Sequence, residues 1–388
     1  MIDPLLRDLF HAYYCARTNK RNSLGALAFE LHYEKNLFEL YHEIKNGQYQ
    51  IGPSVAFIIF DPVQREIIAS SFRDRVVHHL VFNYLNPLFE PRFIHDSYSC
   101  RQNKGTSYGI TRLAHFIRAC SNNYKNQCYV LKLDLAGYFM SINHHILFDK
   151  IVLGLEKNRR PYQFDLTRVL ALVHQIVFHN YTSSCSIRGL KTDWLGLPDN
   201  KSLFNAPRGL GLPIGNLTSQ LFSNVYLNDF DQYIKRELGF TYYGRYVDDL
   251  FFVHQNKLHL TKAIAPIKNK LALLGLQLHP NKIYLQPASR GVNFLGVVIK
   301  PRRIYIRHRI KGNFYQAIAQ INTTLTQNKI TTERKRKILA SINAYLGILG
   351  QYHTFYLRKH ALNQKLAHHF WHYFKLDIKA GFKKVVKK

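Results

Sequence analysis

Three aspartates carry the strongest chemical signal in this sequence. Asp248 and Asp249 are adjacent in the segment Tyr246-Val247-Asp248-Asp249, and Asp134 precedes them by more than one hundred residues. Carboxylates that share two Mg²⁺ ions, about 3.5–4 Å apart, stabilise both the attacking and the leaving oxygen of a phosphoryl displacement. An Asp-Asp pair by itself is more often a simple turn, since Asp is a common turn residue. The interpretation therefore depends on the sequence around the pair.

The flanking sequence predicts the elements that position these side chains. Short apolar runs over 241–247 and 250–253 surround the Asp pair, as in two antiparallel strands joined by a tight turn. Over 129–135, three leucines alternate with Lys132 and Asp134, so the leucines share one face of a strand and the two charged residues the other. We therefore expect Asp134 to end a core strand and to face outward.

Composition and charge indicate a globular protein that binds a polyanion. The 388 residues are 46% hydrophobic and 14% aromatic, which suits two or three subdomains. There are 54 Lys and Arg residues against 24 acids, a net charge of +30, which favours nucleic acid as the partner. Residues 301–388 carry 19 Lys and Arg but only Glu333 and Asp377 as acids. A membrane surface could also attract this segment, but its basic run, residues 334–337, precedes a helical apolar pattern typical of a folded domain.

The cysteines and the first residues indicate a cytoplasmic protein. The five cysteines form no CxxC pair and are odd in number, so we expect neither a disulfide framework nor a zinc ribbon. The chain opens without a cationic start before an apolar block, and no run approaches the roughly 18 apolar residues of a membrane span. We expect no membrane partner.

The remaining pattern predicts mostly helices around these strands. Helices are expected over 1–50, 69–89 and 144–155 and from Arg159-Arg160-Pro161 to about Phe178, and a strand is expected over 55–60. Residues 181–213, rich in Gly and Pro, are expected to form an ordered loop insertion. Asn216 is a natural N-cap of a further helix. The glycines at 209, 211 and 215 would bring exposed backbone N–H groups to that helix start, where they could bind phosphate or a sugar.

The motifs occur in an order that resembles a known family. They are Arg73-Asp74-Arg75, Cys100 to Gly105, Leu131 to Phe139, Gly211 to Leu227, Tyr246 to Asp249, Leu276 to Lys282, and Phe294-Leu295-Gly296. Together they resemble the motif series of reverse transcriptases over about residues 55 to 300. The resemblance implies an α+β, right-hand polymerase fold with N-terminal helices and fingers over 1–125, a ferredoxin-like palm over 126–300 with the insertion at 181–213, and a basic helical thumb over 301–388.

The resemblance also implies the metal chemistry. Asp134, Asp248 and the backbone carbonyl of Leu135 would ligate two Mg²⁺ ions, with Mn²⁺ as a substitute, and Asp249 would be a less direct ligand. A primer 3′-hydroxyl would then attack the α-phosphate of a deoxynucleotide, and pyrophosphate would leave.

Four further residues match functional positions of the family. Phe139 matches the aromatic steric gate that crowds a ribose 2′-hydroxyl, although a core aromatic would read the same. Arg101 and Lys104 match the basic fingers residues that face the triphosphate, where a guanidinium can bridge phosphate oxygens. Lys282 matches the lysine proposed to protonate the leaving pyrophosphate, and a surface lysine is an equal alternative.

One motif points to a branch of the family. In Leu212-Pro213-Ile214-Gly215-Asn216-Leu217-Thr218-Ser219-Gln220, Ile214 stands where most reverse transcriptases have Gln, and Gln220 stands where they have Pro. This resembles the reverse transcriptases of diversity-generating retroelements, in which cDNA with errors opposite adenine replaces part of a variable gene. We hypothesise that Ile214, next to Gly215 of the nucleotide site, offers shape but no hydrogen-bond donor, so mispairs are penalised less.

The resemblance implies partners and leaves alternatives open. The partners would be a template RNA, the RNA–DNA hybrid, deoxynucleotides and a ring of a small basic helical accessory protein, joined to this basic chain through the RNA. The protein would be bacterial or phage-encoded. A reverse transcriptase of retron or phage-defence type is one alternative. A non-catalytic RNA-binding scaffold is another, against which the three intact aspartates argue.

Overall fold

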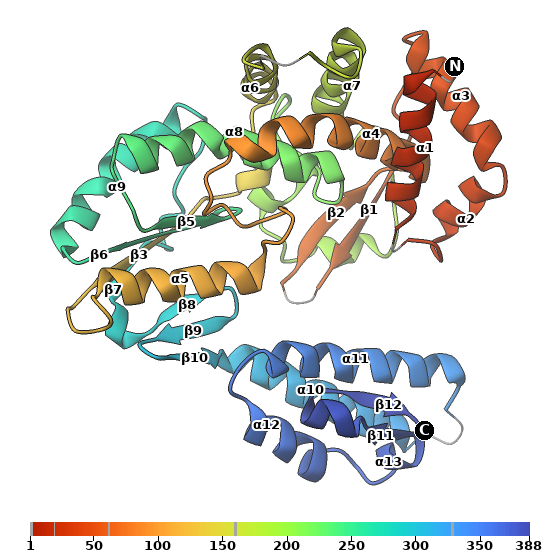
Figure 1. Ribbon diagram of the computed structural model, residues 1–388. Helices are drawn as coiled ribbons and strands as arrows, with labels where there is room; N and C mark the ends of the chain where they lie inside the picture. The colour runs from red at the N-terminus through yellow and green to blue at the C-terminus, as the bar shows by residue number, and fades with distance from the viewer. Residues whose placement is uncertain (1–2, 19, 61–62, 159–160, 327–329) are drawn as a thin grey trace. The chain divides into compact units, whose positions relative to one another are not determined.

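The computed structural model describes residues 3–18, 20–60, 63–158, 161–326 and 330–388 (Figure 1). Contacts within the chain define two units. Unit 1 comprises residues 1–109 and 131–285, and unit 2 comprises residues 110–130 and 286–388. This division cuts across the three consecutive segments expected from the sequence, because residues 110–130 and 286–300 group with the C-terminal part. The finer three-part division stays a prediction.

Unit 1 contains helices in all the regions where the sequence predicts them, and a further helix over 257–272 that was not predicted. They are α1 (Pro4–Arg17), α2 (Leu24–Glu30), α3 (Tyr33–Lys45), α4 (Phe72–Phe89), α6 (His144–Glu156), α7 (Leu166–Phe178), α8 (Leu217–Arg236) and α9 (Lys257–Ala272). The helix expected from 159–161 to Phe178 begins at Leu166, and residues 159–160 lie outside the described part of the chain. Helix α4 begins at Phe72 rather than Ala69, because Ser71 caps it by accepting a hydrogen bond from the Asp74 N–H. The preceding residues, Arg65–Ala69, form a strand instead.

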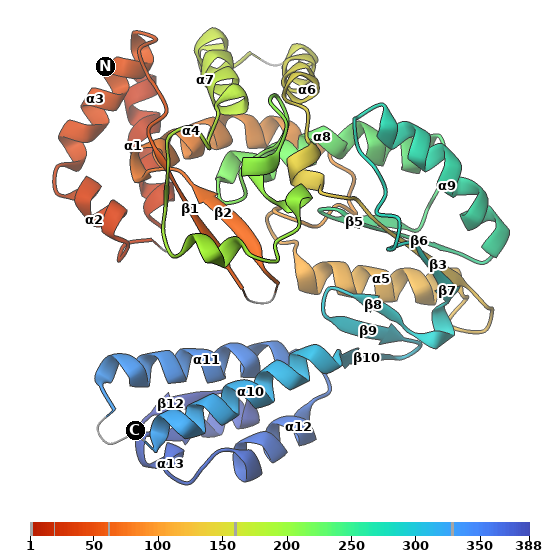
Figure 2. The same cartoon turned by 180° about the vertical axis from the view of Figure 1, so that it is seen from behind.

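A four-stranded sheet forms the centre of unit 1. Its strands are β3 (Tyr129–Asp134), β5 (Tyr243–Tyr246), β6 (Asp249–His254) and β7 (Tyr284–Pro287), in the order β5-β6-β3-β7. Helix α8 precedes β5 and α9 precedes β7, which with this strand order is the ferredoxin-like arrangement expected for the palm. Figures 1 and 2 show α8 and α9 running along the same side of these strands.

A second sheet includes one strand from the insertion, residues 181–213. Strand β1 (Ser54–Ile59) pairs antiparallel with β2 (Arg65–Ala69) and parallel with β4 (Cys185–Ile187), so the insertion contributes one edge strand. One short 3₁₀ helix follows the end of β3, and three more lie in the insertion. They are η2 (Tyr138–Ser141), η3 (Lys191–Trp194), η4 (Asp199–Lys201) and η5 (Leu203–Asn205). Residues 181–213 are thus ordered, as predicted.

Unit 2 combines a small sheet with a basic helical part. Its elements are α5 (Thr106–Cys120), which starts in unit 1, β8 (Val292–Phe294), β9 (Val297–Lys300), β10 (Arg303–Ile306), α10 (His308–Leu325), α11 (Thr332–Gly350), α12 (Phe355–His360), α13 (Phe370–Tyr373), β11 (Phe374–Leu376) and β12 (Val385–Lys387). Phe314, Ile342, Leu346 and Phe370 are fully buried in its core. The basic run at 334–337 therefore belongs to a folded domain.

Two expectations from composition can be compared with this structure. The five cysteines, all within the described residues, form no disulfide in this structure. Among the described residues, no helix combines the length and the apolar character that crossing a membrane requires.

Candidate active site

A two-residue turn places the Asp pair at the tip of the β5–β6 hairpin. Tyr246 pairs with Asp249 across the hairpin, so Val247 and Asp248 form the turn. Val247 has a φ of 55°, which a β-branched residue rarely adopts. Such strain costs on the order of 1–3 kcal/mol and persists only where the surroundings enforce it.

A buried ion pair beneath the turn supplies this enforcement. The guanidinium of Arg245 binds both carboxylate oxygens of Asp231, with an Nη2–Oδ2 distance of 2.7 Å, and each side chain is 1% exposed. Arg245 Nη1 donates to the carbonyl of Val247 over 3.2 Å, and Tyr243 donates its hydroxyl to Asp231 over 2.6 Å. The turn that carries Asp248 is therefore tied through Arg245 to helix α8.

The third aspartate reaches the turn from strand β3. The alternation expected in the sequence is present, since Leu131, Leu133 and Leu135 are buried whereas Asp134 is partly exposed. The backbone N–H of Leu135 donates to the carbonyl of Asp248 over 3.2 Å, which joins the end of β3 to the hairpin turn. The fold thus makes the end of the strand that bears Asp134 a neighbour of the turn that bears Asp248.

Burial and neighbouring charges act on both aspartates of the hairpin. Burial, followed by the charges of Asp134 and Asp249, raises the pKa of Asp248 to about 6. Burial also raises the pKa of Asp249. The positive charge of Lys132 lowers this pKa, and the smaller effect of the negative charge of Asp134 raises it. Carboxylates that repel one another in a poorly solvated site favour either protons or a bound cation.

Two lysines supply positive charge to this cluster. Lys282 Nζ lies 2.9 Å from Asp134 Oδ1, and Lys132 Nζ lies 3.5 Å from Asp249 Oδ1. Asp249 therefore has a cationic neighbour on the adjacent strand, which suits its expected role as the less direct ligand. Lys282, predicted to protonate pyrophosphate, lies with its ammonium next to Asp134. Its role as a proton donor stays a prediction.

The donor chemistry of the site suits a hard divalent cation. Asp134, Asp248 and Asp249 offer only carboxylate oxygens, which are the ligands that Mg²⁺ and Mn²⁺ prefer. Within the part of the chain that the structure describes, no three His, Cys, Asp or Glu side chains converge into a ready-made ligand set. Ligation by these residues and by the Leu135 carbonyl stays a prediction.

The two residues expected beside the nucleotide lie in one apolar region. Phe139 and Ile214 both pack against a buried cluster that includes Ile68 and Met140. The carbonyl of Ile214 accepts a hydrogen bond from the Ile68 N–H over 2.9 Å. Gly215, with a φ of +140°, lies so close to strand β2 that a Cβ atom would meet the Ile68 carbonyl at 2.8 Å. Glycine is required there for close packing as well as for conformation.

The basic fingers residues are already engaged within the protein. The side chain of Arg101 is 5% exposed, its Nε lies 2.8 Å from Glu90 Oε1, and its Nη1 donates to the carbonyls of Ile94 and Ser97. Lys104 Nζ donates to the carbonyl of His95. This geometry favours a structural role for Arg101, and the triphosphate contact of both residues stays a prediction.

Asn216 occupies the expected position but not the expected role. It precedes α8, yet its side chain makes no capping bond to that helix. Its Oδ1 instead accepts from the N–H of Ser70 over 3.2 Å. The sequence pattern located the helix start correctly, whereas the partner of the amide was decided by the strand that packs against it.

Sequence reasoning missed several residues that organise the site. Arg245 and Asp231 form its buried ion pair, and Glu66, 2% exposed on β2, binds the insertion. A charged residue inside an otherwise apolar strand, as Arg245 is, could have signalled a buried partner. No local signal identifies the partner itself.

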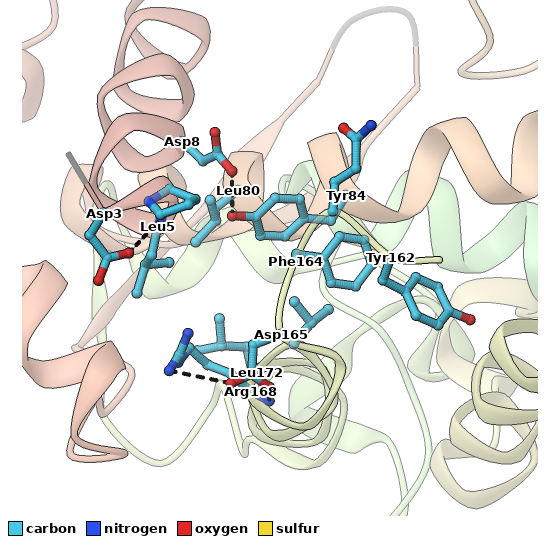
Figure 3. Close-up of a pocket in the computed structure, with 13 residues that line it drawn as sticks. Asp3, Leu5, Asp8, Leu80, Tyr84, Tyr162, Phe164, Asp165, Arg168 and Leu172 are labelled. Carbon is cyan, nitrogen blue, oxygen red and sulfur yellow. Dashed lines mark hydrogen bonds and ion pairs between the residues drawn. The ribbon is translucent and has the colours of Figure 1, made fainter. Parts of the chain in front are cut away.

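A separate hollow of unit 1 is lined by α1, α4 and α7 and does not include any of the three acids (Figure 3). Its volume is about 320 Å³. The rings of Tyr84 and Phe164 stack there with centroids 4.6 Å apart, and Tyr84 donates its hydroxyl to Asp8 over 2.9 Å. Asp165 pairs with Arg168 at this hollow, and its other two acids, Asp3 and Asp8, pair with Lys45 and Arg7. No chemistry is assigned to it.

Comparisons with known proteins identify the family to which the chain is similar. Residues 64–299 match the family described as reverse transcriptase (RNA-dependent DNA polymerase). Protein YkfC of Escherichia coli (strain K12) is 24% identical over 196 residues, which cover 50% of this chain and 43% of YkfC. The structure of apo telomerase from Candida tropicalis aligns with a TM-score of 0.50 at 13% identity, covering 81% of this chain and 58% of that one. The same telomerase truncated from its C-terminal domain aligns with a TM-score of 0.46 at 14% identity, over 71% of this chain and 60% of that one. The chain thus spans less than two thirds of the length of these proteins, and the likeness to the solved structures shows the fold alone.

Proposed function

The chain belongs to the reverse transcriptase family and has its right-hand polymerase fold. From this premise we propose that it is an RNA-directed DNA polymerase that adds deoxynucleotides to a primer by two-metal nucleotidyl transfer. One observation carries the proposal: the end of β3, which bears Asp134, is hydrogen-bonded to the hairpin turn that bears Asp248, since the Leu135 N–H donates to the Asp248 carbonyl over 3.2 Å.

The residues around this cluster have separate tasks in the proposed reaction. Asp134, Asp248 and the Leu135 carbonyl would hold two Mg²⁺ ions, which when bound activate the primer hydroxyl and stabilise charge on the transferring phosphate. Asp249, which lies 3.5 Å from the ammonium of Lys132, would be the less direct ligand of these ions. Lys282 is placed next to Asp134, from where its ammonium can donate a proton to the leaving pyrophosphate.

Two further side chains would select the nucleotide. Phe139 lies five residues after Asp134 and packs in the same apolar region as Ile214. In the proposed complex Phe139 crowds a ribose 2′-hydroxyl, and Ile214 borders the templating pair. Selection by shape alone discriminates by roughly 10–200-fold, less than a site that hydrogen-bonds its substrate achieves.

The experiment that tests the activity is primer extension. The protein is incubated with an RNA template, a DNA primer, labelled deoxynucleotides and Mg²⁺ or Mn²⁺. We expect cDNA from the wild-type chain and none from Asp134→Asn or Asp248→Asn, while the exposed-site control Asp149→Asn remains active. Absence of incorporation by a folded wild-type protein that still binds RNA would leave the non-catalytic scaffold as the correct alternative.

We further propose that the chain serves a diversity-generating retroelement. The motif Ile214-Gly215-Asn216-Leu217-Thr218-Ser219-Gln220 supports this assignment. In this role the enzyme copies a template RNA together with a ring of a small basic accessory protein, and the net charge of +30 favours contacts through the RNA. The setting would be the cytoplasm of a bacterium or of a phage-infected cell.

Sequencing the cDNA tests this finer proposal. The chain is co-expressed with the RNA encoded beside its gene, and the cDNA is sequenced. Errors concentrated opposite template adenines support the retroelement assignment. Faithful copying at adenines would contradict it and would favour a reverse transcriptase of retron or phage-defence type.

A further inference from the structure

The buried carboxylate of Glu66 binds the insertion at three points. Trp194 donates its indole N–H over 2.7 Å, Ser202 its hydroxyl over 2.6 Å, and Leu203 its backbone N–H over 2.6 Å. Glu66 lies on β2 and is 2% exposed. A buried carboxylate that accepts three hydrogen bonds from one segment fixes the position of that segment, because each donor would lose its partner if the segment moved.

Neighbouring contacts hold the insertion to the same hairpin. Gln64 donates its side-chain amide to the carbonyls of Asp193 and Leu195, over 2.8 and 3.1 Å. At the other end of the insertion, Cys185 pairs with Ser54 as β4 joins β1. The insertion is therefore a fixed part of unit 1 rather than a loose connection.

The insertion in turn packs against the chain that follows Asp134. Gly137 has a φ of +54°, and a Cβ atom there would lie 2.7 Å from the carbonyl oxygen of Asn200. Trp194 packs against the same buried cluster as Phe139 and Ile214. The residues proposed to select sugar and base thus share their packing with a tryptophan whose indole is bound by Glu66.

We propose that the insertion, residues 181–213, forms a wall of the nucleotide site, and that Glu66 is the positioning residue that sets nucleotide selection through it. This inference rests on the proposed polymerase function and deepens it. Phe139 and Ile214 have no hydrogen-bonding side chain, so their selectivity depends on where packing holds them. A shift of the wall changes the space left for a 2′-hydroxyl or a mismatched base while leaving the carboxylate cluster in place.

Removing single donors to Glu66 provides the test. Trp194→Phe keeps an aromatic ring but deletes the indole N–H, and Ser202→Ala deletes the hydroxyl. Glu66→Gln is a stronger change, because an amide group must then face donor N–H and O–H groups. The matched controls are Trp371→Phe, which alters the other tryptophan in the core of unit 2, and Glu43→Gln, which alters a carboxylate paired with Arg73.

The measurement is kcat/KM for each deoxynucleotide, its ribonucleotide and a mismatched deoxynucleotide on a defined RNA template. We expect the discrimination ratios to fall about 5–10-fold in Trp194→Phe and Ser202→Ala, the size that corresponds to one lost buried hydrogen bond, and further in Glu66→Gln. The controls should keep wild-type ratios. A merely structural role would lower kcat/KM for all nucleotides alike.

The outcomes separate this inference from the proposed function. If the wild-type protein extends primers and the Trp194 and Ser202 variants keep its discrimination ratios, the inference is wrong and the polymerase assignment stands. If the folded wild-type protein incorporates no nucleotide, the proposed function fails and the inference fails with it. Should Glu66→Gln not fold, the two single-donor variants decide the question.

Discussion

Lys282 and Asp134 are joined by an ion pair with 2.9 Å between Nζ and Oδ1, across 148 residues of sequence. The segment that carries Lys282 also binds the backbone of strand β3, since the N–H of His279 donates to the carbonyl of Asp134 over 2.7 Å. The end of β3 is therefore fixed by the turn that carries Lys282. In the proposed reaction the Lys282 ammonium acts as a counter-ion to Asp134 and as a proton donor to pyrophosphate, and the two tasks can be measured separately.

Lys282→Met should separate catalysis from metal binding. Loss of a general acid lowers kcat, typically by 10²–10⁴-fold, whereas loss of a competing cation beside Asp134 leaves Mn²⁺ affinity equal or higher. Mn²⁺ binding is followed by electron paramagnetic resonance and kcat by single-nucleotide extension. Lys262→Met, at an exposed position of α9, is the control. Unchanged kcat in Lys282→Met would rule out the proton-donor role.

Asp248→Asn should abolish extension and yet stabilise the protein near neutral pH. Burial and neighbouring charges raise the Asp248 pKa from 3.8 to about 6. Between these values the folded state holds a proton that the unfolded state has lost, so wild-type stability decreases as the pH rises from about 4 to 6 and then levels off. Asp248→Asn cannot lose this proton, so its free energy of unfolding above pH 6 should exceed that of the wild type by about 1–3 kcal/mol.

Thermal unfolding with a chelator present, at pH 4.5 and pH 7.5, measures this difference. The gain of Asp248→Asn over the wild type should be larger at pH 7.5. Asp149→Asn, at an exposed position, should show no such pH dependence. A stability gain that is equal at both pH values would contradict the placement of Asp248 in a repelling cluster.

Arg245→Met should be destabilised strongly, because it leaves Asp231 charged and buried without its partner, at a cost of about 3–5 kcal/mol. Arg245→Met with Asp231→Asn removes the unpaired charge and should recover part of the stability. Its kcat should stay low, since nothing then holds the Val247 carbonyl. Denaturant unfolding and single-turnover extension supply the two readouts. Recovery of full kcat in the double variant would show that Arg245 acts through folding alone.

Phe139→Val should weaken discrimination against ribonucleotides. The smaller side chain frees the space that the 2′-hydroxyl needs, and we expect the ratio of kcat/KM for deoxynucleotide over ribonucleotide to fall roughly 10–100-fold. The Mn²⁺ affinity should not change, because Phe139 contributes no ligand. An unaltered ratio would identify Phe139 as a core aromatic only.

Ile214→Gln should lower misincorporation opposite adenine. A Gln side chain adds a hydrogen-bond donor beside the templating pair and would order correct pairs preferentially. Ile214→Val, which keeps an apolar side chain, is the matched control and should retain the wild-type error spectrum. The measurement is deep sequencing of cDNA from one RNA template. If errors opposite adenine are equal in all three proteins, the Ile214 hypothesis is wrong.

Local sequence pattern was sufficient for the elements of the palm. Alternation over 129–135 predicted strand β3 with Asp134 facing outward, and apolar runs around Asp248 predicted the hairpin, because side-chain period and turn chemistry are properties of short segments. The order of the motifs then indicated the polymerase family and its ferredoxin-like sheet. These features follow from residues that are close in sequence.

Only the tertiary structure decided which distant side chains meet. The partners of Arg245, Glu66 and Lys282 lie 14 to 148 residues away, and nothing in the local pattern distinguishes them from other polar residues. Arg101 shows the same limit, since nothing close to it in sequence indicated that its guanidinium pairs with Glu90. A charged side chain in a poorly solvated interior must find an opposite charge or a hydrogen-bond partner, and the packing of whole elements determines which partner is within reach.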